Sequence, residues 1–294
     1  MKINKKYLGI VYIIISAFCF ALMNMFVKLS GDLPSIQKSF FRNFIAMIFA
    51  AILLIKSGQG FKFKKENLGL LFMRSVFGTL GILCNFYAID HLVLSDASML
   101  NKMSPFFVII FSLIFLHEKV NKVQTAAVII AFLGSLLIIK PSFNLTEFLP
   151  ALLGFLGGVG AGAAYTAVRQ LGKKGENGKL VVFFFSSFSC AVTLPFLIFQ
   201  YHEMTWLQLI YLLCAGLAAS GGQFSITAAY FHAPAKEISV YDYSQIIFAA
   251  LIGFIVFGDI PDIYSVIGYI IICAMAVMIF IYNNKLYNKH KGKK

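Results

Sequence analysis

The sequence predicts an all-α integral membrane protein, with ten transmembrane helices arranged as two inverted five-helix repeats. Three observations lead to this prediction. The 294 residues are 60% hydrophobic and 13% charged, whereas soluble domains are roughly 45 to 50% apolar. Ten apolar runs are long enough to cross a bilayer, and the two halves resemble each other at a constant shift of 141 residues.

Each predicted span has about 20 mostly apolar residues, which at 1.5 Å per residue cross roughly 30 Å of hydrocarbon. The ten spans are 8–28, 36–55, 68–89, 94–116, 122–140, 149–168, 180–200, 206–231, 237–257 and 263–282. The first run passes into Lys28 without a small-residue cleavage site, so we expect a retained helix rather than a signal peptide. All five cysteines lie inside spans and none forms a CxxC pair, so we expect neither disulfides nor metal ligands, and no cofactor.

The lysines and arginines of the loops and tails fall almost entirely on one side of the predicted membrane. The other side carries only Lys28, Lys38 and Lys140. Positive loops remain in the cytoplasm, so we expect a multi-pass protein of a bacterial inner membrane with both termini cytoplasmic. The net charge of +13 therefore reports topology and does not indicate a nucleic-acid partner, which would need a basic face on a soluble fold.

The repeat divides the chain into residues 1–141 and 142–294, with five helices in each half. At the shift of 141, the following pairs share their type or charge: Lys28 with Arg169, Gly81 with Gly222, His91 with His232, and Glu118 with Asp259. Because five is odd, the second half must enter the membrane from the opposite face. The repeats are therefore predicted to be inverted, the arrangement typical of secondary transporters.

A motif follows the third helix of each half. It reads AIDHLVLSDASMLNKMSPFFVIIFSLIFLHEKVNKVQ at 88–124 and AYFHAPAKEISVYDYSQIIFAALIGFIVFGDIPDIYS at 229–265. Both segments resemble the repeat of EamA-type drug/metabolite transporters, in which small and polar residues enter a helix, a proline often lies midway, and an aliphatic run ends in Gly-Glu. The first copy has Ser104-Pro105 and ends in His117-Glu118, while the second lacks the proline and ends in Gly258-Asp259. The resemblance implies an exporter without an ATP-binding domain.

Two ionisable residues interrupt these apolar spans. Lys102 lies about eight residues into its span, roughly 12 Å deep, and Asp242 lies near the start of the ninth span. Intramembrane charges are costly and usually functional, although a structural ion pair is the alternative for Lys102. An ammonium and a carboxylate across one cavity would suit a zwitterion. The predicted substrate-binding residues are Lys102, Asp242, Tyr241, Tyr243, Ser98, Ser239, Gln245, Asn101, Arg42 and Tyr165.

Two arginines also lie within predicted helices. Arg42, about six residues into the second span, could add a cation to the cavity or extend outward to the membrane surface. Arg74 lies near the cytoplasmic end of the third span. We expect Arg74 to extend to the interface, where its charge stays hydrated.

The sequence therefore predicts a secondary transporter that moves a small polar metabolite by alternating access, with an amino acid or related zwitterion as first candidate and export as the direction. Carriers of nucleoside-like, cationic or anionic metabolites remain alternatives. A helical receptor or scaffold is a further alternative, and a scaffold predicts that Lys102 and Asp242 form an ion pair with each other. An enzyme is not expected, since no nucleophile with its base, aspartate pair or HExxH motif is evident. Proton coupling through Asp242 or Glu237 and a homodimer remain open.

Overall fold

The computed structural model describes residues 5–58, 60–116, 122–139, 145–232 and 241–291. Within these ranges the chain is 87% helical and contains no strand, which confirms the predicted all-α class. The helices are α1 (Lys5–Leu29), α2 (Ser35–Lys56), η1 (Lys65–Asn67), α3 (Leu68–His91), α4 (Leu94–Asn101), α5 (Ser104–Leu116), α6 (Lys122–Ile139), α7 (Leu145–Lys173), α8 (Gly178–Phe199), α9 (Trp206–His232), α11 (Ser244–Ile252), η2 (Gly253–Phe257) and α12 (Ile263–Lys291). Ser239 and Glu237 lie outside the described residues.

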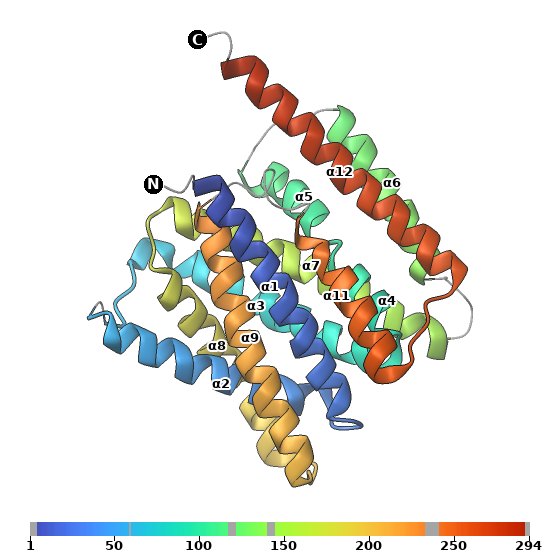
Figure 1. Cartoon of the computed structure of the whole chain (residues 1–294). Coiled ribbons are helices and arrows are strands. Elements are labelled where there is room, and N and C mark those ends of the chain that lie inside the picture. Colours follow the sequence, from blue (N-terminus) through green and yellow to red (C-terminus); the bar gives the residue numbers. More distant parts are fainter. Residues whose placement is uncertain (1–4, 59, 117–121, 140–144, 233–240, 292–294) are drawn as a thin grey trace.

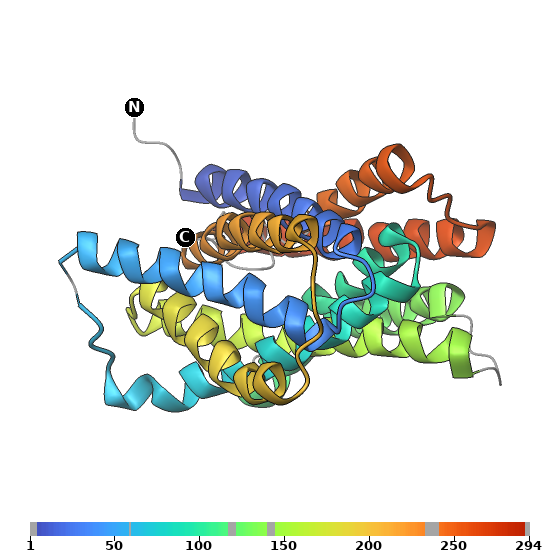
Figure 2. The ribbon, with the colours of Figure 1, turned by 90° about the horizontal axis from the view of Figure 1, so that it is seen from below.

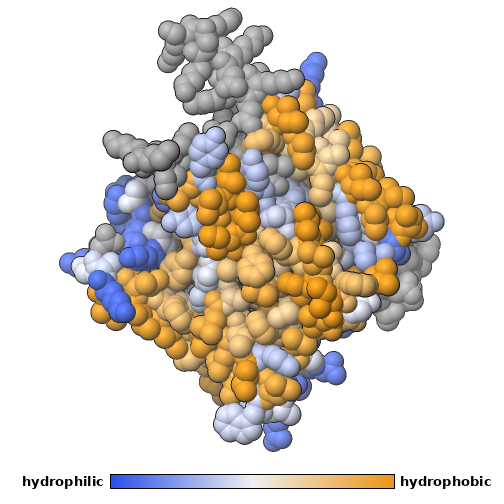
Figure 3. Space-filling model, in the orientation of Figure 1, coloured by the Kyte–Doolittle hydropathy of each residue, from blue (hydrophilic) through white to orange (hydrophobic). Residues whose placement is uncertain are grey.

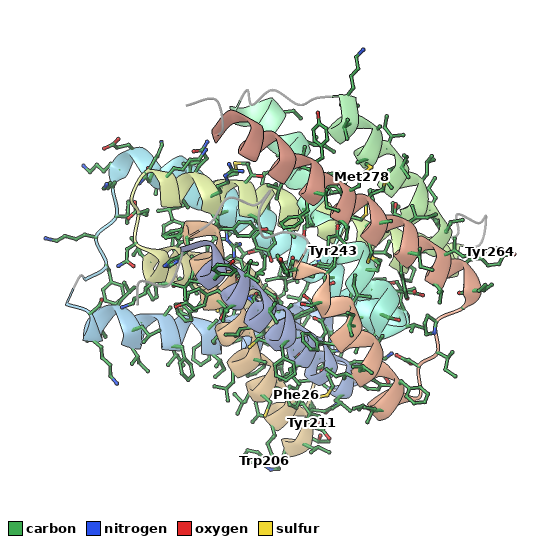
Figure 4. All side chains as sticks on the ribbon, turned by 45° about the horizontal axis from the view of Figure 1, so that its top comes forward. Phe26, Trp206, Tyr211, Tyr243, Tyr264 and Met278 are labelled. Atoms are coloured by element: carbon green, nitrogen blue, oxygen red, sulfur yellow. The ribbon has the colours of Figure 1, made fainter. Side chains whose placement is uncertain are left out.

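Among the described residues, seven helices are long and apolar enough to cross a membrane, namely α1, α2, α3, α7, α8, α9 and α12, so the arrangement of ten spans stays a prediction. Their outer faces expose many large apolar side chains, including Phe199 and Ile270, and Figure 3 shows such residues covering most of one face of the molecule. Phe26, Trp206 and Tyr211 gather where α1 ends and α9 begins (Figure 4). Aromatic side chains concentrate at membrane interfaces, so this group is typical of one membrane boundary.

The sequence predicted one helix over 94–116, and the structure contains two. The span breaks at Lys102 and Met103, between α4 and α5. Pro105 contributes to the break, because it has no N–H to donate to the carbonyl of Asn101. The ninth span also breaks, at Tyr243, before α11 continues into the π-helix η2.

Helix α7 packs closely against the break between α4 and α5. A Cβ added to Gly158 would lie 2.5 Å from the carbonyl oxygen of Leu100, and one added to Gly162 would lie 2.4 Å from the Cβ of Phe107. Glycine permits such close packing of backbones between membrane helices. The position of Lys102 therefore depends on the glycine face of α7.

The two halves of the chain interlock. Helix α1 packs on α9, and α3 packs on α7, while α2 packs on α8 and α6 on α12. Figure 1 shows α6 and α12 running side by side and α1 lying next to α9. Figures 1 and 2 place the start of α1 and the end of α12 at one end of the bundle, opposite the end at which α1 finishes. The α4–α5 and α11–η2 segments lie between these pairs, with α4 in contact with α11.

Candidate substrate-binding site

The two helix breaks bring the predicted ionisable residues into contact. The Nζ of Lys102 lies 2.8 Å from Oδ1 of Asp242, and the two side chains are 3% and 0% exposed. Neither carboxylate oxygen of Asp242 accepts a well-oriented hydrogen bond within the described part of the chain. The contact is thus a buried ion pair whose carboxylate retains acceptor capacity. It is also the contact that the scaffold alternative predicts.

A cavity of about 60 Å³ lies beside this ion pair. That volume is about twice the roughly 30 Å³ that one water molecule occupies in the liquid, so the cavity is too small for most amino acids in this conformation. The polar residues that line the cavity come from seven helices and the α4–α5 break: Asn24, Arg42, Arg74, Asn85, Asn101, Lys102, Tyr165, Gln223 and Gln245.

Several of these side chains have a buried polar atom without a hydrogen-bond partner among the described residues. The acceptors are the amide oxygens of Asn24, Asn85 and Gln245, and the donors are the Nε atoms of Arg42 and Arg74. Buried polar groups in proteins are nearly always hydrogen-bonded. A group of such atoms around one cavity is therefore typical of a place where a polar ligand binds.

The structure separates the predicted site residues into three sets. Those that line the cavity are Lys102, Asn101, Gln245, Arg42 and Tyr165, with Asp242 bound to Lys102. Ser98 lies one step back, where its buried hydroxyl accepts a 3.4 Å hydrogen bond from Asn24. Tyr241 and Tyr243 line a separate apolar hollow between α1, α11 and α12, and Figure 4 shows Tyr243 next to α11.

The expectation that Arg74 extends to the membrane surface was wrong. Arg74 is 3% exposed, its Cζ lies 3.9 Å from the centroid of the Phe185 ring, and its Nη2 donates a 2.8 Å hydrogen bond to Gln223. Gly78, one turn further along α3, makes the inward orientation sterically feasible, because a Cβ there would lie 2.0 Å from the Nη1 of Arg74. Arg74 is consequently part of the cavity wall.

The sequence reasoning also missed the uncharged amides of the cavity: Asn24 on α1, Asn85 on α3 and Gln223 on α9. Each lies inside an apolar run, where a polar amide is unfavourable unless it finds a partner. That signal could have identified them. Only the folded arrangement shows that they face the same cavity.

A second ion pair ties together the end of the bundle where α1 finishes. The Nζ of Lys28 lies 2.6 Å from Oδ2 of Asp259, and both side chains are about one fifth exposed, at 19% and 18%. The same oxygen accepts a 3.1 Å hydrogen bond from the backbone N–H of Leu94, and Lys28 lies 4.8 Å from the ring centroid of Phe257. This cluster links α1, the start of α4 and the residues after η2.

Many apolar helices around a small polar cavity, with two broken helices at its wall, define a multi-pass membrane protein of the transporter class. The chain belongs to the EamA-like transporter family, whose profile matches it twice, at residues 7–140 and 148–281. These matches confirm the resemblance drawn from the sequence and the internal duplication, and their starting points are separated by the predicted shift of 141 residues.

Individual relatives support the same class. The pseudopaline exporter CntI of Pseudomonas aeruginosa is 32% identical over 271 residues, covering 92% of this chain and 94% of the exporter. Human solute carrier family 35 member G1 is 28% identical over 284 residues, 92% of this chain and 78% of the carrier. A riboflavin transporter of Vibrio cholerae is 25% identical over 264 residues, 86% of each chain. A solved crystal structure shares the fold, with a TM-score of 0.69 at 12% identity, covering 95% of this chain and 98% of the other.

Proposed function

We propose that this protein is a secondary transporter that exports a small polar metabolite by alternating access, with amino acids and related zwitterions as the first candidates. The observation that carries the proposal is the buried pair of Lys102 and Asp242 at the junction of two broken helices, beside a cavity with unpartnered polar atoms. Broken helices near the middle of the membrane are where many transporters bind substrate. The exporter among the relatives supports the direction.

The helix packing supports an inverted repeat with halves at 1–141 and 142–294. If α7, α8, α9 and α12 correspond to α1, α2, α3 and α6, then the pairing of α1 with α9 is the counterpart of the pairing of α7 with α3. The pairs α2 with α8 and α6 with α12 each join a helix to its own counterpart. Such a twofold relation allows the halves to exchange conformations and expose one central site to either side in turn.

A zwitterion can replace the internal ion pair without leaving a buried charge alone. Its carboxylate would take the place of Asp242 beside Lys102, and its ammonium would take the place of Lys102 beside Asp242. Breaking a buried pair without such replacement is strongly unfavourable. The Lys102–Asp242 ion pair then represents the site without ligand, and a suitable ligand competes with each of the two side chains for the other. Cationic, nucleoside-like and purely anionic ligands could each satisfy at most one of the two charges.

Counterflow into proteoliposomes tests the proposal. Vesicles containing the purified protein are loaded with unlabelled amino acids, and entry of each labelled amino acid is followed. We expect saturable, trans-stimulated uptake of at least one zwitterion. Saturable flux of only nucleosides or cations would contradict the substrate class, and ligand binding without flux of any solute would indicate a receptor.

The proposed orientation places both termini on the cytoplasmic side of a bacterial inner membrane. The basis is the lysine-rich composition of the loops and tails at that side. A C-terminal fusion to green fluorescent protein should fluoresce, while a fusion to alkaline phosphatase should be inactive, because phosphatase needs the periplasm. The opposite pattern would reverse the topology. We also propose proton coupling through Asp242 or Glu237, which the dependence of flux on a pH gradient tests, and a homodimer, which the mass of the solubilised particle tests.

The Lys28–Asp259 cluster is predicted to close the non-cytoplasmic end of the transporter. Asp259→Asn should weaken the closed arrangement at a stability cost below about 1 kcal/mol, since the pair is partly exposed. The reporter is Ile82→Cys, at the cavity wall, in a background without the native cysteines. A membrane-impermeant maleimide added from outside should label it several-fold faster in the Asp259→Asn variant.

Glu203→Gln serves as the matched control, because it neutralises an exposed carboxylate at the same end of the bundle. It should leave the labelling rate unchanged. Equal labelling in the parent, Asp259→Asn and Glu203→Gln proteins would show that Lys28 and Asp259 do not restrict access.

A further inference from the structure

We infer that Arg42 and Arg74, which both lie against the Phe185 ring and line the central cavity, form an oxyanion clamp there, and that the substrate carries a carboxylate or phosphate group and a net negative charge. The inference rests on the proposed function, because it takes the cavity to be the substrate site. It goes beyond that function by assigning a net negative charge to the substrate and by naming the two arginines as the residues that bind its oxyanion.

The geometry of the two arginines is that of a prepared site. Their Cζ atoms lie 3.9 Å (Arg74) and 5.8 Å (Arg42) from the centroid of the same phenylalanine ring, and both side chains line the cavity. Uncharged amides hold them in place, since Arg42 donates to Asn43 and Arg74 donates to Gln223. Among the described residues, the Nε of each arginine has no hydrogen-bond partner. Arginine N–H groups suit bidentate binding of carboxylate or phosphate.

The charge balance also distinguishes this pair. Three lysines with side chains no more than about one fifth exposed, Lys28, Lys38 and Lys102, each pair with an aspartate. Arg42 and Arg74 are 1% and 3% exposed, yet no described carboxylate forms an ion pair with either. Two buried cations without an anion are unfavourable. An anionic ligand would offset that cost, and the Lys102–Asp242 pair adds no net charge to the cavity.

The duplication indicates that the arginines serve a ligand rather than the architecture. The shift of 141 residues places Phe183 opposite Arg42 and Ala215 opposite Arg74, so neither cation recurs in the second half. By contrast, Lys28 recurs as Arg169. A residue needed to pack the repeat would be expected in both copies.

The cavity is also polarised along its length. Asn85 lies about three turns beyond Arg74 on α3, roughly 16 Å along the helix axis. The unpartnered oxygens of Asn85, Asn24 and Gln245 are acceptors, whereas the arginines are donors. A ligand would therefore bind with its oxyanion at the clamp and its ammonium or hydroxyl groups towards the amide oxygens. Acidic amino acids and other carboxylated amines have this pattern of charge.

Thermal unfolding of the purified full-length protein in detergent tests the clamp. The probes are glutamate, glutarate and inorganic phosphate, with alanine and choline at equal ionic strength for comparison. An oxyanion that binds should raise the Tm of the parent protein by several degrees, because a ligand of the folded state stabilises it by mass action. A response to the carboxylates assigns a carboxylate clamp, and a response to phosphate alone assigns a phosphate clamp.

The variants are Arg42→Gln and Arg74→Gln, with Lys56→Gln as the control because Lys56 is an exposed cation on α2. The Gln variants should weaken oxyanion binding at least about tenfold, while the control binds as the parent does. If either Gln variant does not fold, Arg42→Lys and Arg74→Lys keep the charge but lose the planar fork, and they should bind carboxylate more weakly than the parent.

Two results would overturn the clamp: no oxyanion stabilises the parent protein at about 10 mM, or the folded arginine variants bind it as the parent does. Counterflow separates this failure from failure of the proposed function. Zwitterion flux that persists unchanged in Arg74→Gln would leave the transporter and refute the clamp. Oxyanion binding that depends on the arginines, without flux of any solute, would leave the clamp and refute transport.

Discussion

Asp242→Asn is expected to abolish transport and to lower the free energy of unfolding by about 3 to 5 kcal/mol, because it leaves the buried Lys102 ammonium without its counter-charge. Lys102→Met should have a similar effect, since it leaves the fully buried Asp242 carboxylate unpaired. Denaturant unfolding in detergent measures the free energy of unfolding, and counterflow in proteoliposomes measures transport.

The double variant Lys102→Met/Asp242→Leu separates a structural role from a functional one. Replacing a buried ion pair with apolar residues of similar volume is often neutral or stabilising, so we expect stability close to that of the parent protein. Transport should remain absent, because neither charge is left to bind a zwitterion. A double variant that transports at the parental rate would show that the pair serves only the architecture, as in a scaffold.

Gly158→Ala is expected to cost about 1 to 3 kcal/mol of stability and to reduce transport strongly. The added Cβ would lie 2.5 Å from the Leu100 carbonyl oxygen and 3.2 Å from that of Asn101. Both oxygens belong to the backbone of the two residues that precede Lys102, so relief of the clash must displace the helix break. Thermal unfolding and counterflow measure the two effects.

Gly69→Ala is the matched control for this substitution. Gly69 lies in α3, and a Cβ added there would meet no other atom within 4 Å. Alanine favours a helix over glycine by up to about 1 kcal/mol, so the control should be neutral or slightly stabilising. Equal stability and transport in the Gly158→Ala and parent proteins would show that close packing of α7 does not position the break.

Much of the fold could be predicted because membrane spans leave a long one-dimensional signal. Apolar runs of about 20 residues mark the helices, and the shift of 141 residues agrees with the two family matches. The helix breaks were harder to predict. Pro105 is a local signal for the first break, whereas the break at Tyr243 has no proline beside it and lies at the position that corresponds to Lys102 under the shift of 141 residues.

The site could be predicted only in part, because the sequence gives the depth of a residue but not the direction of its side chain. Lys102 and Asp242 were identified from their depth, and the structure places them in contact. The position of Arg74 along its helix is the same whether its side chain points outward or inward. The inward direction depends on Gly78 and on Phe185, which belongs to another helix. Tyr243 was expected at the cavity but lies at another hollow, because the break turns its ring towards α5 and α12.

The measurement that tests alternating access most directly is the accessibility of Ile82→Cys from each side of the membrane. Intact cells and inside-out vesicles present the two sides to the same impermeant maleimide. We predict labelling from both sides, slowed from both by a transported zwitterion, because one cavity opens to each side in turn. Labelling from one side only, whether or not substrate is present, would contradict the account.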